Sequence, residues 1–128
     1  METLDYTVET KKSFDEAVEA VLARTKDKSF GVLHVHDVQA TLASKGFTRG
    51  PLKIIEICNP KHAYDVLEKD IRIGLMLPCP ITVYAQDGRT YISALRPRLM
   101  GSFYPEAHIE ATAEAVDKAI TAIVDEAR

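Results

Sequence analysis

The dipeptide Asp87-Gly88 is the feature that most constrains how this chain can fold. It lies between residues 81–85 and residues 90–95, two segments in which apolar and polar side chains alternate. Alternation with a period of two is typical of half-buried strands. Asp-Gly between two such strands predicts a tight hairpin. A hairpin joins antiparallel neighbours, so the sequence favours an antiparallel sheet over a doubly wound parallel fold.

Three further strands and four helices are predicted around this hairpin. Alternating or bulky apolar residues indicate strands at residues 4–9, 30–36 and 52–58. Helices are predicted after the N-cap residues Ser13, Asp37 and Asn59 and from Pro105 onward. Their expected bounds are residues 14–26, 38–45, 60–69 and 105–127.

The length and the apolar content fit one globular domain. The chain has 128 residues, of which 46% are hydrophobic, and domains cluster at roughly 100–150 residues. We therefore predict a single α+β domain over residues 1–128. Its mostly antiparallel sheet should have five or six strands, with helices packed on one face.

Composition argues against two classes of partner. The net charge is −3, whereas a protein that binds nucleic acid broadly presents a basic face. No apolar run reaches the ~20 residues that span a bilayer, and the N-terminus lacks the pattern of a signal peptide. Two cysteines are too few for a disulfide framework. These features predict a cytoplasmic protein with reduced thiols that binds neither nucleic acid nor a membrane.

One face of the predicted sheet carries an unusual set of side chains. If Leu33 and Val35 face the helices, Val32 and the two histidines of that strand face away. The same alternation turns these candidate ligand-binding residues outward: His34, His36, Glu56, Cys58, Tyr84 and Tyr91. Such a face fits a small-molecule pocket, a homodimer interface or an ordinary exposed sheet.

The spacing of two histidines and two cysteines also fits a soft metal. His34-x-His36 places two imidazoles on one strand face, and Glu56-x-Cys58 does the same for a carboxylate and a thiol. Together with Cys79 these side chains suit Zn²⁺ or Cu⁺. The alternative is that the histidines are hydrogen-bonded or interfacial, with no cofactor bound.

The cysteines allow a catalytic interpretation as well. Cys58 precedes the predicted helix start at Asn59, where the helix dipole favours a thiolate. Cys79 lies between two prolines and could pair with Cys58. His62 could act as the base that activates Cys58. No established catalytic motif is present, and free cysteines are commonly small buried hydrophobes.

Two segments resemble an uncharacterised bacterial and archaeal family, domain of unknown function 302. They are Ile-Glu-Ile-Cys-Asn-Pro-Lys-His-Ala at residues 55–63 and Gly-Leu-Met-Leu-Pro-Cys-Pro-Ile-Thr-Val-Tyr at residues 74–84. The resemblance covers about residues 14–100. It implies a curved, partly split antiparallel sheet similar to that of the TATA-binding-protein-like group, and self-association. It implies no activity, substrate or catalytic residue.

Three functions remain open at this point. The first is a non-catalytic homodimeric module that binds a small ligand or a soft metal near Cys58 and Cys79. The second is a thiol-based redox or hydrolytic enzyme that uses Cys58, with Cys79 or His62 assisting. The third is a purely structural or interaction domain, whose outward face is the dimer contact.

Overall fold

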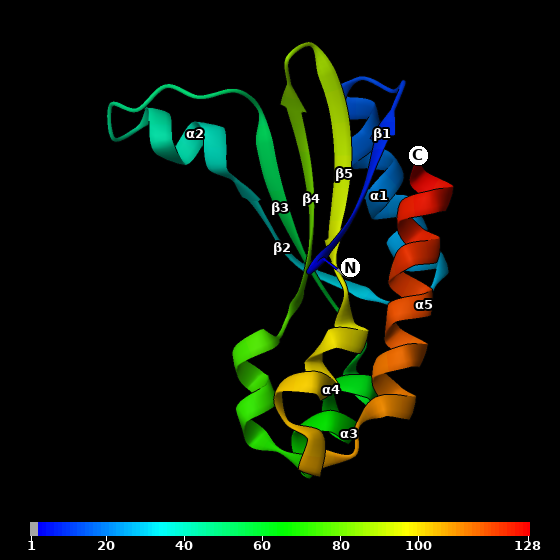
Figure 1. The fold of residues 1–128 in the computed structure, drawn as a ribbon. Helices are drawn as coiled ribbons and strands as arrows, with labels where there is room; N and C mark the ends of the chain where they lie inside the picture. The colour runs from blue at the N-terminus through cyan, green and yellow to red at the C-terminus, as the bar shows by residue number, and fades with distance from the viewer. Residues whose placement is uncertain (1–2) are drawn as a thin grey trace.

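The computed structural model describes residues 3–128 (Figure 1). Within this range five strands form one antiparallel sheet, in the order β1-β5-β4-β3-β2. The strands are β1 (Asp5–Thr10), β2 (Gly31–Asp37), β3 (Leu52–Cys58), β4 (Cys79–Gln86) and β5 (Arg89–Leu95). The α-helices are α1 (Phe14–Asp27), α2 (Val38–Ala43), α3 (Pro60–Lys69), α4 (Met100–Phe103) and α5 (Glu110–Ala127). Short 3-10 helices are η1 (Ile71–Met76), η2 (Pro97–Leu99) and η3 (Pro105–Ala107).

Strands β4 and β5 form the predicted hairpin at Asp87-Gly88. Gln86 pairs with Arg89, which leaves a two-residue loop. Both loop residues have a positive φ, 53° at Asp87 and 76° at Gly88, as a type I′ turn requires. The hairpin and the antiparallel α+β class are therefore confirmed.

Three helices begin at the side chains that the sequence predicts as caps. Ser13 and Glu16 form a reciprocal capping box at the start of α1. The side chains of Asp37 and Asn59 cap α2 and α3. Each cap satisfies an N–H group that the first turn of a helix leaves unpaired. Asn59 thereby fixes the point where β3 ends and α3 begins.

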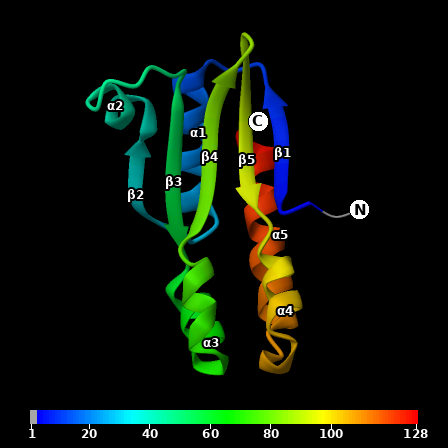
Figure 2. The same cartoon turned by 60° about the vertical axis from the view of Figure 1, so that its left-hand side comes forward.

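Helices α1 and α5 cover one face of the sheet (Figures 1 and 2). The inward side chains of the strands meet the apolar stripes of both helices in one core. Its fully buried members include Ile55, Ile57, Ile81, Val83, Ile92, Val21, Ile120 and Ile123. Within residues 3–128 no helix is long and apolar enough to cross a membrane.

The other helices leave the second face of the sheet uncovered. Helix α3 with η1, and α4 with η2 and η3, extend beyond one end of the sheet (Figures 1 and 2). A second small core joins these two groups through Val66, Ile73, Met100 and Ile109. Helix α2 projects beside the edge strand β2 and has no buried residue.

A β-bulge in β2 makes one prediction wrong. The register of β2 against β3 shifts between Val32 and His34. Val32 and Val35 therefore pack against the core, whereas Leu33 is 59% exposed. The extra residue in one strand exchanges the expected directions of Val32 and Leu33. His34 and His36 still lie on the uncovered face, as predicted.

The last helix begins later than predicted. Pro105 opens only the 3-10 helix η3, and His108 has a φ of 54°. A residue in the left-handed region interrupts a right-handed helix, so α5 begins at Glu110. The preceding segment, for which the sequence predicts neither helix nor strand, forms η2 and α4 at the end of the sheet.

Candidate functional site

Two histidines and one glutamate form a cluster on the uncovered face. The rings of His34 and His36 meet edge to face, with their centroids 4.3 Å apart. Nε2 of His36 lies 3.3 Å from Oε2 of Glu56 on the neighbouring strand β3. The structure thus brings together three of the residues predicted to bind a ligand.

Tyr84 and Tyr91 lie elsewhere on the same face. Their rings stack with centroids 5.3 Å apart, because the two residues pair across β4 and β5. They adjoin the hairpin turn, whereas Cys79 begins β4 at its opposite end. The tyrosines and the thiols, which the sequence assigns to one site, are therefore separated along most of β4.

The four predicted metal ligands form two separate pairs. His34 and His36 lie on the uncovered face, whereas Cys58 and Cys79 line a cavity near helix α3. In the part of the chain that the structure describes, no three His, Cys, Asp or Glu side chains form a group that could hold a metal ion.

A cleft of about 640 Å³ opens at one end of the uncovered face. The ends of β3, β4 and β5 form its floor, and η1 and the η2–α4 segment form its walls. Apolar side chains dominate the lining, including Ile54, Pro80, Leu95, Leu75, Met76, Leu99 and Phe103. The charged residues that line the cleft are Glu56 and Arg96. Small-molecule sites have this size and this mixture of many apolar groups and few polar ones.

A buried carboxylate holds the guanidinium of Arg96 in the cleft wall. Nη2 and Nε of Arg96 donate to the two carboxylate oxygens of Asp117 at 2.8 and 3.3 Å. The Asp117 side chain is only 6% exposed. These hydrogen bonds raise the pKa of Arg96, so the guanidinium stays charged. The carboxylate of Asp117 therefore balances the positive charge of Arg96.

Further contacts brace the two walls of the cleft against each other. Arg72, in η1, lies 4.4 Å above the ring of Tyr104, which itself lines the cleft. Asp70 accepts hydrogen bonds from Arg72 at 2.6 and 2.9 Å and so orients it. Lys69 donates to the carbonyl oxygen of His108 at 2.9 Å. The cleft is therefore a preformed feature of the fold.

Large apolar side chains remain exposed around the cleft. Leu4, Leu75 and Phe103 line it and are 59%, 85% and 65% exposed. Single exposed apolar residues are common, but several around one concavity indicate a binding surface.

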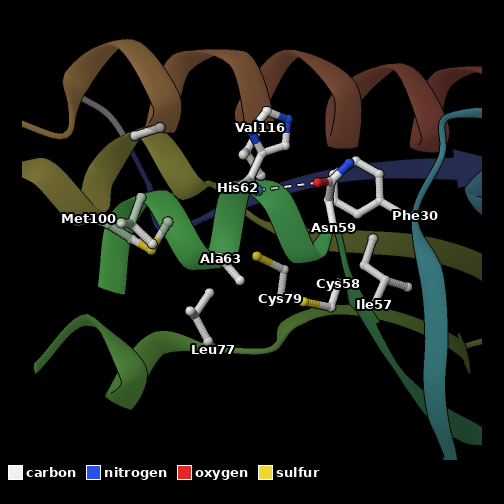
Figure 3. A pocket seen from close by; sticks show the side chains of 12 residues that line it. Phe30, Ile57, Cys58, Asn59, His62, Ala63, Leu77, Cys79, Met100 and Val116 are labelled. Carbon is white, nitrogen blue, oxygen red and sulfur yellow. Dashed lines mark hydrogen bonds between the residues drawn. The ribbon is translucent and has the colours of Figure 1, made fainter. Parts of the chain in front are cut away.

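Cys58 and Cys79 line a second and much smaller cavity, of about 20 Å³. This volume holds about one water molecule, so it excludes an organic ligand. Both thiols lie below α3, whereas the ring of His62 lies on the other side of that helix, toward α5 (Figure 3). The two thiols therefore lie on the same side of α3, whereas the ring of His62 points away from them.

Cys58 lines this cavity from the end of β3. It is the last residue of β3, directly before the cap Asn59. It shares the small cavity with Phe30, Val66 and Val116 on the helix side of the sheet.

The protein environment makes both thiols weak acids. Burial raises the pKa of Cys58. Burial, with a smaller effect from the charge of Cys58, raises the pKa of Cys79 to about 11. A thiol with that pKa is about 0.01% thiolate at pH 7, and the thiolate is the nucleophile. This state is the opposite of an activated cysteine.

We expect iodoacetamide to alkylate Cys79 slowly at neutral pH. Since the folded-state pKa is raised, the rate should increase about tenfold per pH unit from pH 7 to pH 10. Peptide mass spectrometry at each pH measures the labelled fraction, and the same protein in concentrated urea gives the unhindered rate. Labelling of the folded protein at neutral pH as fast as in urea would contradict this assignment.

Sequence reasoning missed most of the cleft. Of the predicted ligand-binding residues only Glu56 lines it. Leu75 and Phe103 belong to segments without clear strand or helix periodicity, so their side chains had no predictable direction. The one available signal was the apolar run at residues 74–78, which contains glycine and ends in proline.

Comparison with known proteins places this architecture in a family. The model of the family "Domain of unknown function DUF302" matches residues 6–127. A crystal structure of an uncharacterized conserved DUF302 protein from Bacillus stearothermophilus is similar, with a TM-score of 0.92. Its sequence is 30% identical, and the alignment covers 99% of this chain and 100% of that one. A search of the curated proteins found no match. The chain therefore belongs to the DUF302 family, as its sequence motifs indicated.

Proposed function

We propose that this protein is a non-catalytic binding module whose ligand is a small apolar molecule held in the cleft. The observation that carries the proposal is a braced cleft of about 640 Å³ with a mostly apolar lining. Sites for small organic molecules occupy about 300–1,000 Å³ and have this composition. The proposed binding site is therefore on the uncovered face of the sheet, whereas the sequence predicts a site near the two thiols.

The charges around the cleft disfavour an anionic ligand. Asp117 balances Arg96 within the protein, and His36 stands 3.3 Å from Glu56. An anionic ligand would lose its hydration without gaining an unpaired cation, because Asp117 already holds Arg96. A neutral molecule would bury apolar surface and could accept from Arg96 or donate to Glu56.

Two observations support a non-catalytic role. The pKa of each thiol is raised, which opposes nucleophilic chemistry at Cys58. His62, the base of the alternative thiol enzyme, lies on the far side of α3 from Cys58 (Figure 3). Both cysteines are free thiols, which supports the proposal that the protein works in the reducing cytoplasm.

Self-association is the second proposal, and the rim of the cleft favours it. Leu4, Leu75 and Phe103 extend the apolar surface beyond the volume of a small molecule. The same surface carries one carboxylate, Glu56, and one guanidinium, Arg96. A twofold axis that brings Glu56 of one copy to Arg96 of the other makes this contact twice, because residue i meets j and j meets i in such an interface. In this form the dimer would close the cleft over its ligand.

Native mass spectrometry of freshly purified protein tests both proposals. We expect an adduct of a few hundred daltons on the 14.2 kDa chain, or on a dimer of it. A chain without any adduct, which also takes up no neutral apolar dye such as Nile red, would overturn ligand binding. A purely monomeric mass at micromolar concentration would overturn self-association.

A further inference from the structure

The small cavity near α3 is lined by two thiols that the cleft does not contain. Three sulfur-bearing side chains line it: Cys58, Cys79 and Met100. Figure 3 shows the thiols of Cys58 and Cys79 on the same side of α3, with Met100 further along that helix. These residues come from β3, β4 and α4, so the fold brings together sulfurs from three distant segments.

The volume and lining of this cavity restrict what can occupy it. About 20 Å³ accommodates a single water molecule or one ion. Its wall is almost entirely apolar, with residues such as Ile57 and Val66, whereas a buried water needs two to four polar partners. Water is therefore a poor occupant.

The available ligands select a soft monovalent cation. Thiolate and thioether sulfurs favour Cu⁺ over harder metals. Structural Zn²⁺ requires four nitrogen or sulfur ligands, but the cavity offers three sulfurs, and His62 points toward α5 (Figure 3). Cu⁺ remains as the ion whose preferences the side chains match.

We propose that Cys58 and Cys79 bind one Cu⁺ ion as thiolates in this cavity, whose lining also includes the thioether of Met100. Each thiol releases one proton on binding, and neither copper nor sulfur changes oxidation state. The resulting dithiolate carries one net negative charge. Cys58 directly precedes the start of α3, whose N-terminal dipole stabilises that charge. Cys58 is only partly buried, which gives the ion access from solvent.

Anaerobic titration with Cu⁺, using bicinchoninate as the competing chelator, tests this proposal. We expect the wild-type protein to bind one equivalent, and Cys58→Ser or Cys79→Ser to weaken binding at least 100-fold. His62→Ala is the matched control from the same cavity lining and should bind as the wild type does. Thermal melts establish that each variant is folded before its affinity is compared.

X-ray absorption of the loaded wild-type protein gives an independent readout. Sulfur neighbours alone around copper are expected, whereas nitrogen neighbours would overturn the assignment. Equal Cu⁺ affinity of the wild type and Cys58→Ser would overturn it as well. Leu75→Glu, which alters only the cleft, should leave Cu⁺ affinity unchanged. The copper proposal and the proposal of ligand binding in the cleft are therefore tested independently.

Discussion

Asp117→Ala is expected to lower the free energy of unfolding by about 3 kcal/mol, because it leaves Arg96 without its buried partner. Asp117 is 4% exposed as a residue, and it also accepts from the backbone N–H of Arg98 at 3.4 Å. The Arg96 side chain is 23% exposed, so water recovers part of the loss and the effect falls at the lower end of the range for buried pairs. Urea denaturation monitored by circular dichroism measures the change.

Asp125→Ala is the matched control for this prediction. Asp125 lies on the same helix but is exposed, and it accepts a 2.6 Å hydrogen bond from the Tyr6 hydroxyl. Exposed interactions of this kind contribute less than about 1 kcal/mol. Equal destabilisation by both variants would show that the Arg96–Asp117 pair does not hold the cleft wall.

Leu75→Glu is expected to weaken the binding of Nile red at least tenfold. Leu75 lines the cleft and is 85% exposed in the free protein, so the substitution should not impair folding. It removes apolar surface from the site and places a carboxylate beside the bound dye. A loss of about 1.4 kcal/mol in binding free energy is enough for a tenfold effect. Fluorescence titration of the dye measures both affinities.

Ile71→Glu provides a control of the same chemistry in the same segment. Ile71 is 80% exposed and lies at the start of η1, outside the lining of the cleft. Its dye affinity should match that of the wild type. If both variants lose affinity equally, the dye responds to surface charge in general and the cleft is not its site.

Much of the fold could be predicted because its signals are local. Asp87-Gly88 specifies a turn with two positive φ angles, and only a few residue types accept them. The caps at Ser13 and Asn59 act within one helical turn. The family motifs implied an antiparallel α+β fold of the same class. Features of this kind are determined by four or five consecutive residues.

The exceptions depend on contacts between distant segments. The bulge at Leu33 is set by the register of β2 on β3, which no property of β2 alone reveals. His108 adopts a left-handed conformation that ends η3, although histidine has only a weak preference for it. Because of the bulge, Val32 faces the core and Leu33 faces solvent, opposite to the prediction. Because of His108, α5 begins at Glu110 and not at Pro105.

The candidate site was harder to predict than the fold. Strand alternation correctly placed His36 and Glu56 on the uncovered face, where they contact each other. It could not show that the end of that face is walled by η1 and α4, since the direction of Leu75 and Phe103 follows from tertiary packing.

Photolabelling with a small uncharged diazirine, followed by peptide mapping, tests most directly whether the cleft is a binding site. We expect labels concentrated in residues 75–80 and 95–104, the two segments that supply most of the cleft lining. Excess Nile red should suppress these labels. Labels spread over the surface, or concentrated on the projecting α2 segment and insensitive to the dye, would contradict binding in the cleft.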